Sequence, residues 1–259
     1  MNAEYEYLFK LLTRLKLVMI KEKLDFLLEE ASKKDMNLRE ALTFFCEQEV
    51  QNKDHKRIQM GINLAKFPFS RTLDQFDFSA QPSIDNGQIR ELSTCRWIGN
   101  GDALLLLGPP GVGKTHLAIS LGREAIRQGY SVLFIQAAAL LTQLAKAHLD
   151  GNLEDKINQF SKAKLLIIDE LGYLPFDPKA AHLFFQLVSK RYEKGSTLIT
   201  SNRSVSEWGE VFGDSVVAAA ILDRLLHHSH VVIIRGESYR LKEKRKSGLI
   251  NDQKLKDIK

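Results

Sequence analysis

The hydrophobic pattern divides the chain into two parts. Over the first 66 residues apolar side chains recur at helical spacing, as Leu8 and Leu12 do, and these residues include no proline and a single glycine. Asn37, followed three residues later by Glu40, predicts a capping box at the start of a further helix. We therefore expect residues 1–66 to form a small all-helical domain that binds a partner or helps the chain to oligomerise, although simple self-packing of its apolar stripe remains an alternative.

From residue 67 onward the pattern changes to short apolar runs that alternate with helical stretches. These runs contain almost no polar positions, as in strands that are covered on both faces. Alternation of such strands with helices is typical of an α/β domain with a parallel sheet. The five predicted strands are 103–107, 131–135, 165–169, 197–200 and 231–234. Two helices, 137–148 and 153–161, are expected between the second and third strands.

Length and composition agree with this division. The chain has 259 residues, of which 44% are hydrophobic and 27% are charged, and this excludes wholesale disorder. The net charge is +5. Residues 235–259 hold nine Lys and Arg against four Asp and Glu, so the whole surplus lies in this basic tail. The core between residues 67 and 234 is nearly neutral, and net charge alone does not establish an acidic partner.

The sequence also carries expectations about compartment. Its longest apolar runs are far too short to span a bilayer, and its first residues lack the apolar stretch and cleavage site of an export signal. The two cysteines, Cys46 and Cys95, have no metal-ligand spacing and are expected to be reduced, partly buried thiols. We therefore expect a cytoplasmic protein with no membrane contact.

The strongest chemical signal follows the first predicted strand and precedes a helical stretch. Its eight residues match the phosphate-binding P-loop pattern, Gly108-Pro109-Pro110-Gly111-Val112-Gly113-Lys114-Thr115. The glycines let the backbone turn tightly and present amides to phosphate oxygens, and the helix N-terminus adds partial positive charge. Lys114 is expected to bridge the β and γ phosphates, and the Thr115 hydroxyl to ligate Mg²⁺. We include His116, the next residue, among the expected nucleotide-binding residues.

Two later strands should deliver side chains to the same edge of the sheet. The third predicted strand ends in Asp169 and Glu170. We expect Asp169 to hold Mg²⁺ and Glu170 to polarise the attacking water as general base. The fourth strand leads to Asn202, whose amide can orient that water, although Ser201 and Asn202 can instead cap the next helix. A kinase would need a recognisable site for the molecule that accepts the phosphoryl group, and the sequence shows none. ATP hydrolysis is therefore favoured over phosphoryl transfer to another substrate.

The order of these elements resembles the nucleotide site of AAA+ ATPases. The stretches 67–78, 168–173 and 220–225 resemble the IstB-like ATP-binding proteins encoded by one class of bacterial insertion sequences, and 235–240 extends the likeness. That family is in turn similar to the DnaC helicase loaders. The resemblance implies a P-loop NTPase of the AAA+ class, with a five-stranded parallel sheet flanked by helices and a helical N-terminal domain. The usual C-terminal lid is expected to be reduced or absent, which departs from the family pattern.

The resemblance also implies roles for two arginines. Arg224 looks like the arginine finger that reaches into the site of a neighbouring subunit and neutralises charge developing on the γ-phosphate. A surface salt bridge with Asp223 or Glu210 is the alternative. Arg240 resembles the late arginine that senses nucleotide within its own subunit. The match is weaker there, because the 25 residues that remain after the last strand cannot build a full lid domain.

The stretch between the second and third strands holds candidates for DNA contacts. The resemblance to helicase loaders and initiators implies that an insertion here lines the DNA path. Its basic side chains are Lys146, His148, Lys156, Lys162 and Lys164. They lack the arginine-rich character of a sequence-specific reader, so binding should be salt-sensitive and sequence-independent. Solvated helix faces are the alternative. The basic run 242–246 could likewise grip phosphate or simply aid solubility.

Three histidines near the end of the core, His227, His228 and His230, look at first like a metal cluster. Their spacing matches no known ligand set, and no cysteine or carboxylate close in the sequence completes one. We expect them instead to end a helix, where an imidazolium suits the helix dipole.

Taken together, these signals predict an ATP-dependent, DNA-binding AAA+ ATPase that uses ATP and Mg²⁺. It is expected to form a homo-oligomer on duplex DNA in the presence of ATP. The resemblance implies that it delivers target DNA to, or stimulates, the transposase encoded by the same element. The main alternative is a replicative helicase loader of the DnaC type, which acts on a hexameric helicase and single-stranded DNA. A second alternative is a DNA-architectural protein that uses nucleotide only structurally.

Overall fold

The computed structural model describes residues 3–173 and 176–246. The chain forms two compact units, Met1–Met60 and Gly61–Lys259. The division falls within the helix α4 (Leu38–Ala65), a few residues before the boundary expected at residue 66. Among the described residues, no helix combines the length and the apolar character needed to cross a membrane.

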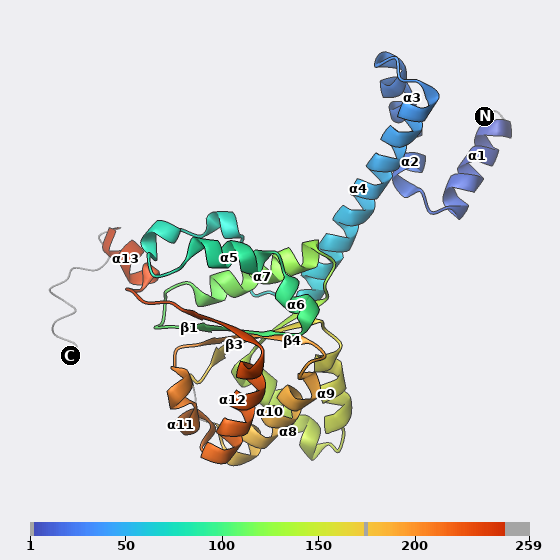
Figure 1. The fold of residues 1–259 in the computed structure, drawn as a ribbon. Coiled ribbons are helices and arrows are strands. Elements are labelled where there is room, and N and C mark those ends of the chain that lie inside the picture. The colour runs from blue at the N-terminus through green and yellow to red at the C-terminus, as the bar shows by residue number, and fades with distance from the viewer. Residues whose placement is uncertain (1–2, 174–175, 247–259) are drawn as a thin grey trace. The chain divides into compact units, whose positions relative to one another are not determined.

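The first unit is helical, as the sequence predicts. It contains α1 (Ala3–Arg14), α2 (Val18–Glu22), α3 (Leu24–Lys33) and most of α4 (Figure 1). Leu12, Ile20, Leu24 and Leu27 form its small core. The predicted capping box is present, because the Glu40 N–H donates to Asn37 Oδ1 and the Asn37 N–H donates to Glu40 Oε2, both at 3.0 Å.

Five parallel strands form the sheet of the second unit, in the order β2-β3-β4-β1-β5. They are β1 (Ala103–Leu107), β2 (Val132–Gln136), β3 (Leu165–Leu171), β4 (Ser196–Ser201) and β5 (Ser229–Ile233). Every predicted strand is present; β1 has the predicted bounds, and no end of the others is shifted by more than two residues. All five side chains of β1 are buried because β1 lies between β4 and β5 and its two faces are covered.

Helices cover both faces of this sheet (Figure 1). On one side lie α5 (Asn86–Ser93) and α7 (Lys114–Arg127), and α6 (Arg96–Asn100) packs against β4. The other side is covered by α8 (Ala137–Leu149), α9 (Leu153–Ser161), α10 (Pro178–Arg191), α11 (Trp208–Phe212) and α12 (Ser215–His227). Leu140 of α8 and Phe160 of α9 belong to the main core. The stretch between β2 and β3, which was expected to be an insertion that lines the DNA path, therefore helps to cover the sheet.

Two segments outside the predicted strands and helices fold together near the loop that follows β1. The first contains the short 3₁₀ turns η1 (Leu73–Gln75) and η2 (Phe78–Ala80), and the second leads into α13 (Tyr239–Lys246). Ser83 Oγ donates to the Arg235 carbonyl at 2.7 Å, and Gln81 Nε2 donates to the Glu237 carbonyl at 3.1 Å. The predicted basic tail is thus partly an element of the fold, and its residues 247–259 lie outside the described part of the chain.

Candidate nucleotide-binding site

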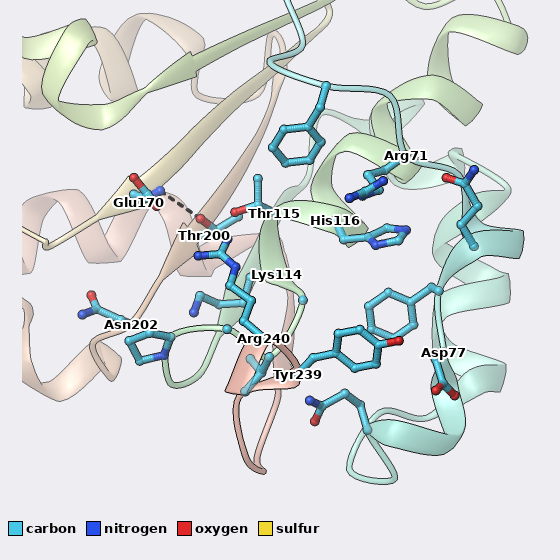
Figure 2. Close-up of a pocket in the computed structure, with 18 of the residues that line it drawn as sticks. Arg71, Asp77, Lys114, Thr115, His116, Glu170, Thr200, Asn202, Tyr239 and Arg240 are labelled. Carbon is cyan, nitrogen blue, oxygen red and sulfur yellow. Dashed lines mark hydrogen bonds between the residues drawn. The ribbon is translucent and has the colours of Figure 1, made fainter. Parts of the chain in front are cut away.

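A cavity of about 390 Å³ lies at the carboxyl edge of the sheet, where the loop after β1 begins α7. This volume is typical of small-molecule sites. The lining residues come from the segment before α5, from the P-loop, from the ends of β3 and β4, and from α13. Figure 2 shows Lys114, Thr115, Glu170 and Asn202 toward one end, and His116, Tyr239 and Asp77 toward the other.

The P-loop glycines are required by the backbone and by close packing. Gly111 and Gly113 have φ values of +82° and +100°, which L side chains rarely adopt. A Cβ atom at Gly113 would lie 2.6 Å from the ring of Phe76, and one at Gly111 would collide with the side chain of Ser238. Phe76 and Ser238, from two segments distant in sequence, therefore pack so closely against the loop that only glycine fits at these two positions.

Lys114 begins α7, and its ammonium group is held within the loop. Its Nζ donates to the carbonyl oxygens of Gly108 and Pro109 at 2.7 and 2.8 Å. Burial lowers the pKa of Lys114, the carboxylates of Asp169 and Glu170 oppose that shift, and Arg240 adds to it. A partly buried cation at the start of a helix suits an anionic ligand such as a phosphate group.

The predicted loop residues do not all face the cavity. Pro110 through His116 line it, whereas Gly108 and Pro109 are absent from its lining. The Gly108 N–H donates to the Ser201 carbonyl at 3.1 Å, so this amide joins the end of β1 to β4. Gly108 and Pro109 contribute through their carbonyl groups, which hold Lys114.

Asp169 and Thr115, the two predicted metal ligands, lie in direct contact. Thr115 Oγ1 is 2.9 and 3.1 Å from the two carboxylate oxygens of Asp169, which is 3% exposed. Burial raises the pKa of Asp169, whereas hydrogen bonds from Thr200 and Thr115 and the charges of Lys114 and Arg240 lower it. Hydroxyl and carboxylate oxygens are the donors that Mg²⁺ prefers. This pair therefore fits a magnesium ion.

Thr200 was not among the residues predicted for the site. Its hydroxyl donates to Asp169 Oδ1 at 2.7 Å and accepts the Glu170 N–H at 2.9 Å. One side chain thus fixes both acidic residues relative to each other. Thr200 lines the cavity and is fully buried in β4, directly after Leu198 and Ile199, so the sequence pattern marks it only as part of a strand.

Glu170 owes its exposure to an irregularity in β3. The pairing of β3 with β4 shifts register between Ile168 and Leu171, so the strand continues past its predicted end at Asp169. Glu170 has a φ of +62°, and its side chain is exposed while the residues on either side are buried. Strained backbone and bulges often occur beside active sites because they redirect a side chain. Here the irregularity presents the carboxylate to the cavity.

Asn202 also lines the cavity, and its Oδ1 atom is buried without a hydrogen-bond partner among the described residues. The alternative in which it caps the next helix does not hold. Ser204 caps the following turn, η3 (Val205–Glu207), in a capping box with Glu207. The unpartnered amide oxygen agrees with a role toward a ligand or a water molecule, because buried polar atoms are normally hydrogen-bonded.

The far end of the cavity is aromatic, and His116 is the only residue there that the sequence motif predicted. Phe76 packs edge-on against the His116 ring, with centroids 5.2 Å apart. His116 Nε2 lies 2.9 Å from the Thr72 carbonyl, which fastens this segment to α7. Burial lowers the pKa of His116, the Thr72 carbonyl opposes the shift and Arg71 adds to it. Tyr239 completes this end, which offers apolar surface suited to a nucleotide base.

The two arginines occupy different places. Arg240 of α13 lines the cavity (Figure 2). Arg224 does not: its guanidinium donates to the Ala220 carbonyl at 3.0 Å and lies 4.7 Å from the centre of the Phe185 ring. Within the described residues it forms no salt bridge with Asp223 or Glu210. Arg224 instead lines a second, small pocket beside the start of β1.

The basic residues predicted to contact DNA differ in their surroundings. Lys146, His148 and Lys162 are exposed. Lys164 Nζ donates to the Lys194 carbonyl at 3.2 Å, and Lys156 Nζ lies 5.4 Å from the centre of the Phe160 ring. The cysteine prediction was correct for Cys95, which is buried, and wrong for Cys46, which is exposed; both are free thiols.

Comparison with known proteins adds a family context. A family model described as IstB-like ATP binding protein matches residues 10–247. The chain is 48% identical over 240 residues to the "Insertion sequence IS21 putative ATP-binding protein" of Pseudomonas aeruginosa, covering 93% of this chain and 91% of the relative. It is also 48% identical over 244 residues to the "Insertion sequence IS5376 putative ATP-binding protein" of Geobacillus stearothermophilus, covering 94% and 96%.

Solved structures confirm the fold. The DnaC helicase loader matches with a TM-score of 0.52 at 23% identity, over 66% of this chain and 99% of that chain. AMPPCP-bound DnaA from Aquifex aeolicus matches with a TM-score of 0.52 at 22% identity, over 72% of this chain and 58% of that chain. The P-loop, the five-stranded parallel sheet and its flanking helices form the AAA+ fold that the sequence predicts.

Proposed function

Because this chain belongs to the family of IstB-like ATP-binding proteins, we propose that its cavity binds ATP with Mg²⁺ and hydrolyses the nucleotide to ADP and phosphate. One observation carries the proposal. Thr115, Asp169 and Thr200 form a continuous hydrogen-bonded cluster beside Lys114, and the same cluster fixes Glu170 at the cavity. A site built only to hold a nucleotide would not need an exposed carboxylate in that position.

Each side chain has a task that follows from its surroundings. Lys114 offers its charge to the phosphates, and Thr115 and Asp169 are the residues that would hold Mg²⁺. The metal would neutralise charge that develops on the phosphate oxygens. Glu170 has an exposed carboxylate that can accept a proton from the attacking water. The Asn202 amide oxygen, which has no hydrogen-bond partner in the described part of the chain, can orient that water.

The proposal extends to assembly. Arg224 lies outside the cavity of its own chain, so an arginine finger at this position must act on a neighbouring subunit. We therefore expect ATP to promote a homo-oligomer on duplex DNA, and hydrolysis to release it. The names of the relatives, which are ATP-binding proteins of insertion sequences, support a role in transposition in which the oligomer delivers target DNA to the transposase of the same element or stimulates it.

A helicase-loading function is the second candidate, because the DnaC loader shares the fold. Insertion-sequence relatives at 48% identity favour transposition over it. The two functions differ in the DNA that they require. Preferential assembly on single-stranded DNA, together with binding to a hexameric helicase, would favour loading, whereas ATP-dependent assembly on duplex DNA favours transposition.

The substitution Glu170→Gln tests the catalytic assignment. It removes the proton acceptor and leaves the phosphate-binding groups in place, so ATP should still bind while turnover falls about 100-fold or more. The variant should also remain on DNA longer than the unmodified protein. Phosphate release, nucleotide binding by filter assay and gel shift on duplex DNA measure these three effects.

Glu210→Gln is the matched control, because Glu210 is another exposed glutamate and does not line the cavity. It should turn over ATP like the unmodified protein. Normal turnover by Glu170→Gln would contradict the assignment of the general base. Failure of the unmodified protein to bind ATP at all would contradict the proposed function itself.

A further inference from the structure

Three side chains distant in sequence meet at the surface of the second unit. Glu193 follows the end of α10, His227 is the last residue of α12, and His228 follows it. Their ligand atoms all lie within 4.8 Å of one another, and all three residues are exposed. The packing of α10 against α12 brings them together. We propose that Glu193, His227 and His228 form a binding site for a divalent transition-metal cation, with zinc as the reference ion.

The chemistry of the set suits zinc. Two imidazole nitrogens and one carboxylate are a common zinc ligand combination, and a fourth position stays open for water or another ligand. Tetrahedral bonds of about 2.1 Å would place ligand atoms about 3.4 Å apart. The present separations are at most 4.8 Å, and rotation of exposed side chains can close the difference. The two imidazole rings are already close, with centroids 4.1 Å apart.

The Tyr192 hydroxyl orients the His227 ring, which is one of the proposed ligands. Tyr192 Oη lies 2.8 Å from Nδ1 of His227, which leaves Nε2 of that ring for the metal. Metal-binding histidines usually bond a second group through their other nitrogen, because this fixes the tautomer and the ring orientation. The sequence predicted that these histidines end a helix, as His227 does, and it found no nearby carboxylate. Glu193 supplies that carboxylate through the fold.

The site is separate from the nucleotide cavity. Glu193, Tyr192 and His228 line the small second pocket together with Arg224. The guanidinium of Arg224 opposes a cation there, and the carboxylate of Glu193 offsets this repulsion. Arg224 lies over the Phe185 ring, which places its charge against an aromatic face.

Titration of the nucleotide-free protein with zinc ion alone tests this proposal. The full chain should carry Cys46→Ser, because the exposed thiol of Cys46 is an independent zinc ligand. Isothermal calorimetry should then give saturable binding of one zinc per chain. Removal of one imidazole by His228→Ala should weaken that binding at least about tenfold. Cobalt ion should give the visible absorption of a tetrahedral site without thiolate ligands.

His230→Ala is the matched control. His230 is also a partly exposed histidine of this region, but it pairs with Asp102 at 3.6 Å and lies outside the cluster. It should bind zinc like the parent protein, and circular dichroism should confirm that both variants are folded. Absence of saturable binding, equal affinity of the His228→Ala variant, or an equal loss in the His230→Ala variant would each overturn the proposed site.

Discussion

At the scale of single residues, Asp169 is a carboxylate in a buried environment that disfavours its ionised form. The carboxylate is 3% exposed, and burial raises its pKa despite hydrogen bonds from Thr115 and Thr200. A carboxyl group whose pKa is raised in the folded state makes the fold less stable when it ionises. The site thus gives up stability to keep a negative charge where a metal ion would bind, as functional sites often do.

The substitution Asp169→Asn should therefore stabilise the nucleotide-free protein at pH 7. The amide keeps an acceptor for Thr200 and carries no charge. Each kcal/mol gained should raise the midpoint of thermal unfolding by about 2–4 °C. The advantage should be complete above the raised native pKa of Asp169 and should fade as the pH falls toward the ordinary value for aspartate. Thermal unfolding of both proteins between pH 4 and 8, at roughly one-unit steps, measures this.

The same variant should lose magnesium-dependent ATP hydrolysis, because a neutral amide is a weaker magnesium ligand. Ser120→Ala provides a control, since it removes a buried hydroxyl that lies outside the cavity and has no hydrogen-bond partner among the described residues. That control should leave nucleotide turnover largely unchanged. A lower unfolding midpoint for Asp169→Asn at pH 7 would contradict the stability argument.

At the scale of elements, Arg191 joins the strands at the edge opposite the cavity. This residue ends α10 and is 2% exposed. Its guanidinium donates to the carbonyl oxygens of Phe160, Ala163 and Ser196 at 2.9, 2.9 and 2.5 Å. These bonds connect the end of α9 with the starts of β3 and β4. Burial lowers the pKa of Arg191 to about 10, so the group remains charged at neutral pH.

Replacement by a side chain of similar length tests this role. Arg191→Met should destabilise the protein by about 3–5 kcal/mol, because several buried carbonyl groups lose their donor together. Chemical denaturation followed by circular dichroism measures the loss. Arg127→Met is the control, since Arg127 forms a surface ion pair with Glu124 and such pairs contribute about 0–1 kcal/mol. A similar change in both variants would contradict the role of Arg191.

The elements also show what the sequence could predict. All five strands were found because each contains a short run of apolar residues, and this pattern needs no long-range information. The P-loop glycines and the Thr115–Asp169 contact followed from local motifs placed at the ends of strands. The bulge at Glu170 was not predictable, because no local pattern reports a register shift between β3 and β4.

Other parts of the site depend on contacts between distant segments. Phe76 and Tyr239 belong to stretches without regular periodicity. They are held at the cavity by contacts between distant segments, among them the bonds of residues 81–83 to residues 235–237 and the bond from the Tyr239 N–H to the Gly111 carbonyl. Thr200 is hidden within a buried strand. Glu193 lies 34 positions before His227 in the sequence. Sequence spacing carries no signal for such pairs, since packing alone makes them neighbours.

At the scale of the whole molecule, each unit has surface residues that could contact another protein chain. In the first unit, α4 exposes large apolar side chains, among them Leu38 at 87% and Leu42 at 62%. Such exposure in a helical unit agrees with the proposed partner binding or oligomerisation. In the second unit, Arg224 is the predicted contribution of one subunit to the next. Assembly is therefore the property on which the proposed function most depends.

Mixing two inactive variants tests that assembly. Arg224→Ala keeps a complete cavity but lacks the finger, whereas Glu170→Gln lacks the general base but keeps its finger. If Arg224 acts between subunits, each variant alone should hydrolyse ATP at least about 100-fold more slowly than the unmodified protein. Their mixture on duplex DNA should recover activity, because Glu170→Gln subunits supply Arg224 to the intact cavities of their Arg224→Ala neighbours. Phosphate release at varied mixing ratios measures the recovery.

The Lys190→Ala variant serves as a control for surface charge on the same side of the sheet, and it should hydrolyse ATP normally both alone and in mixtures. Recovery should be greatest near equal proportions of the two variants, because Arg224→Ala subunits then have Glu170→Gln neighbours most often. A mixture no more active than the sum of its parts would show that Arg224 does not act between subunits. Full activity of Arg224→Ala alone would show that this arginine has no part in hydrolysis.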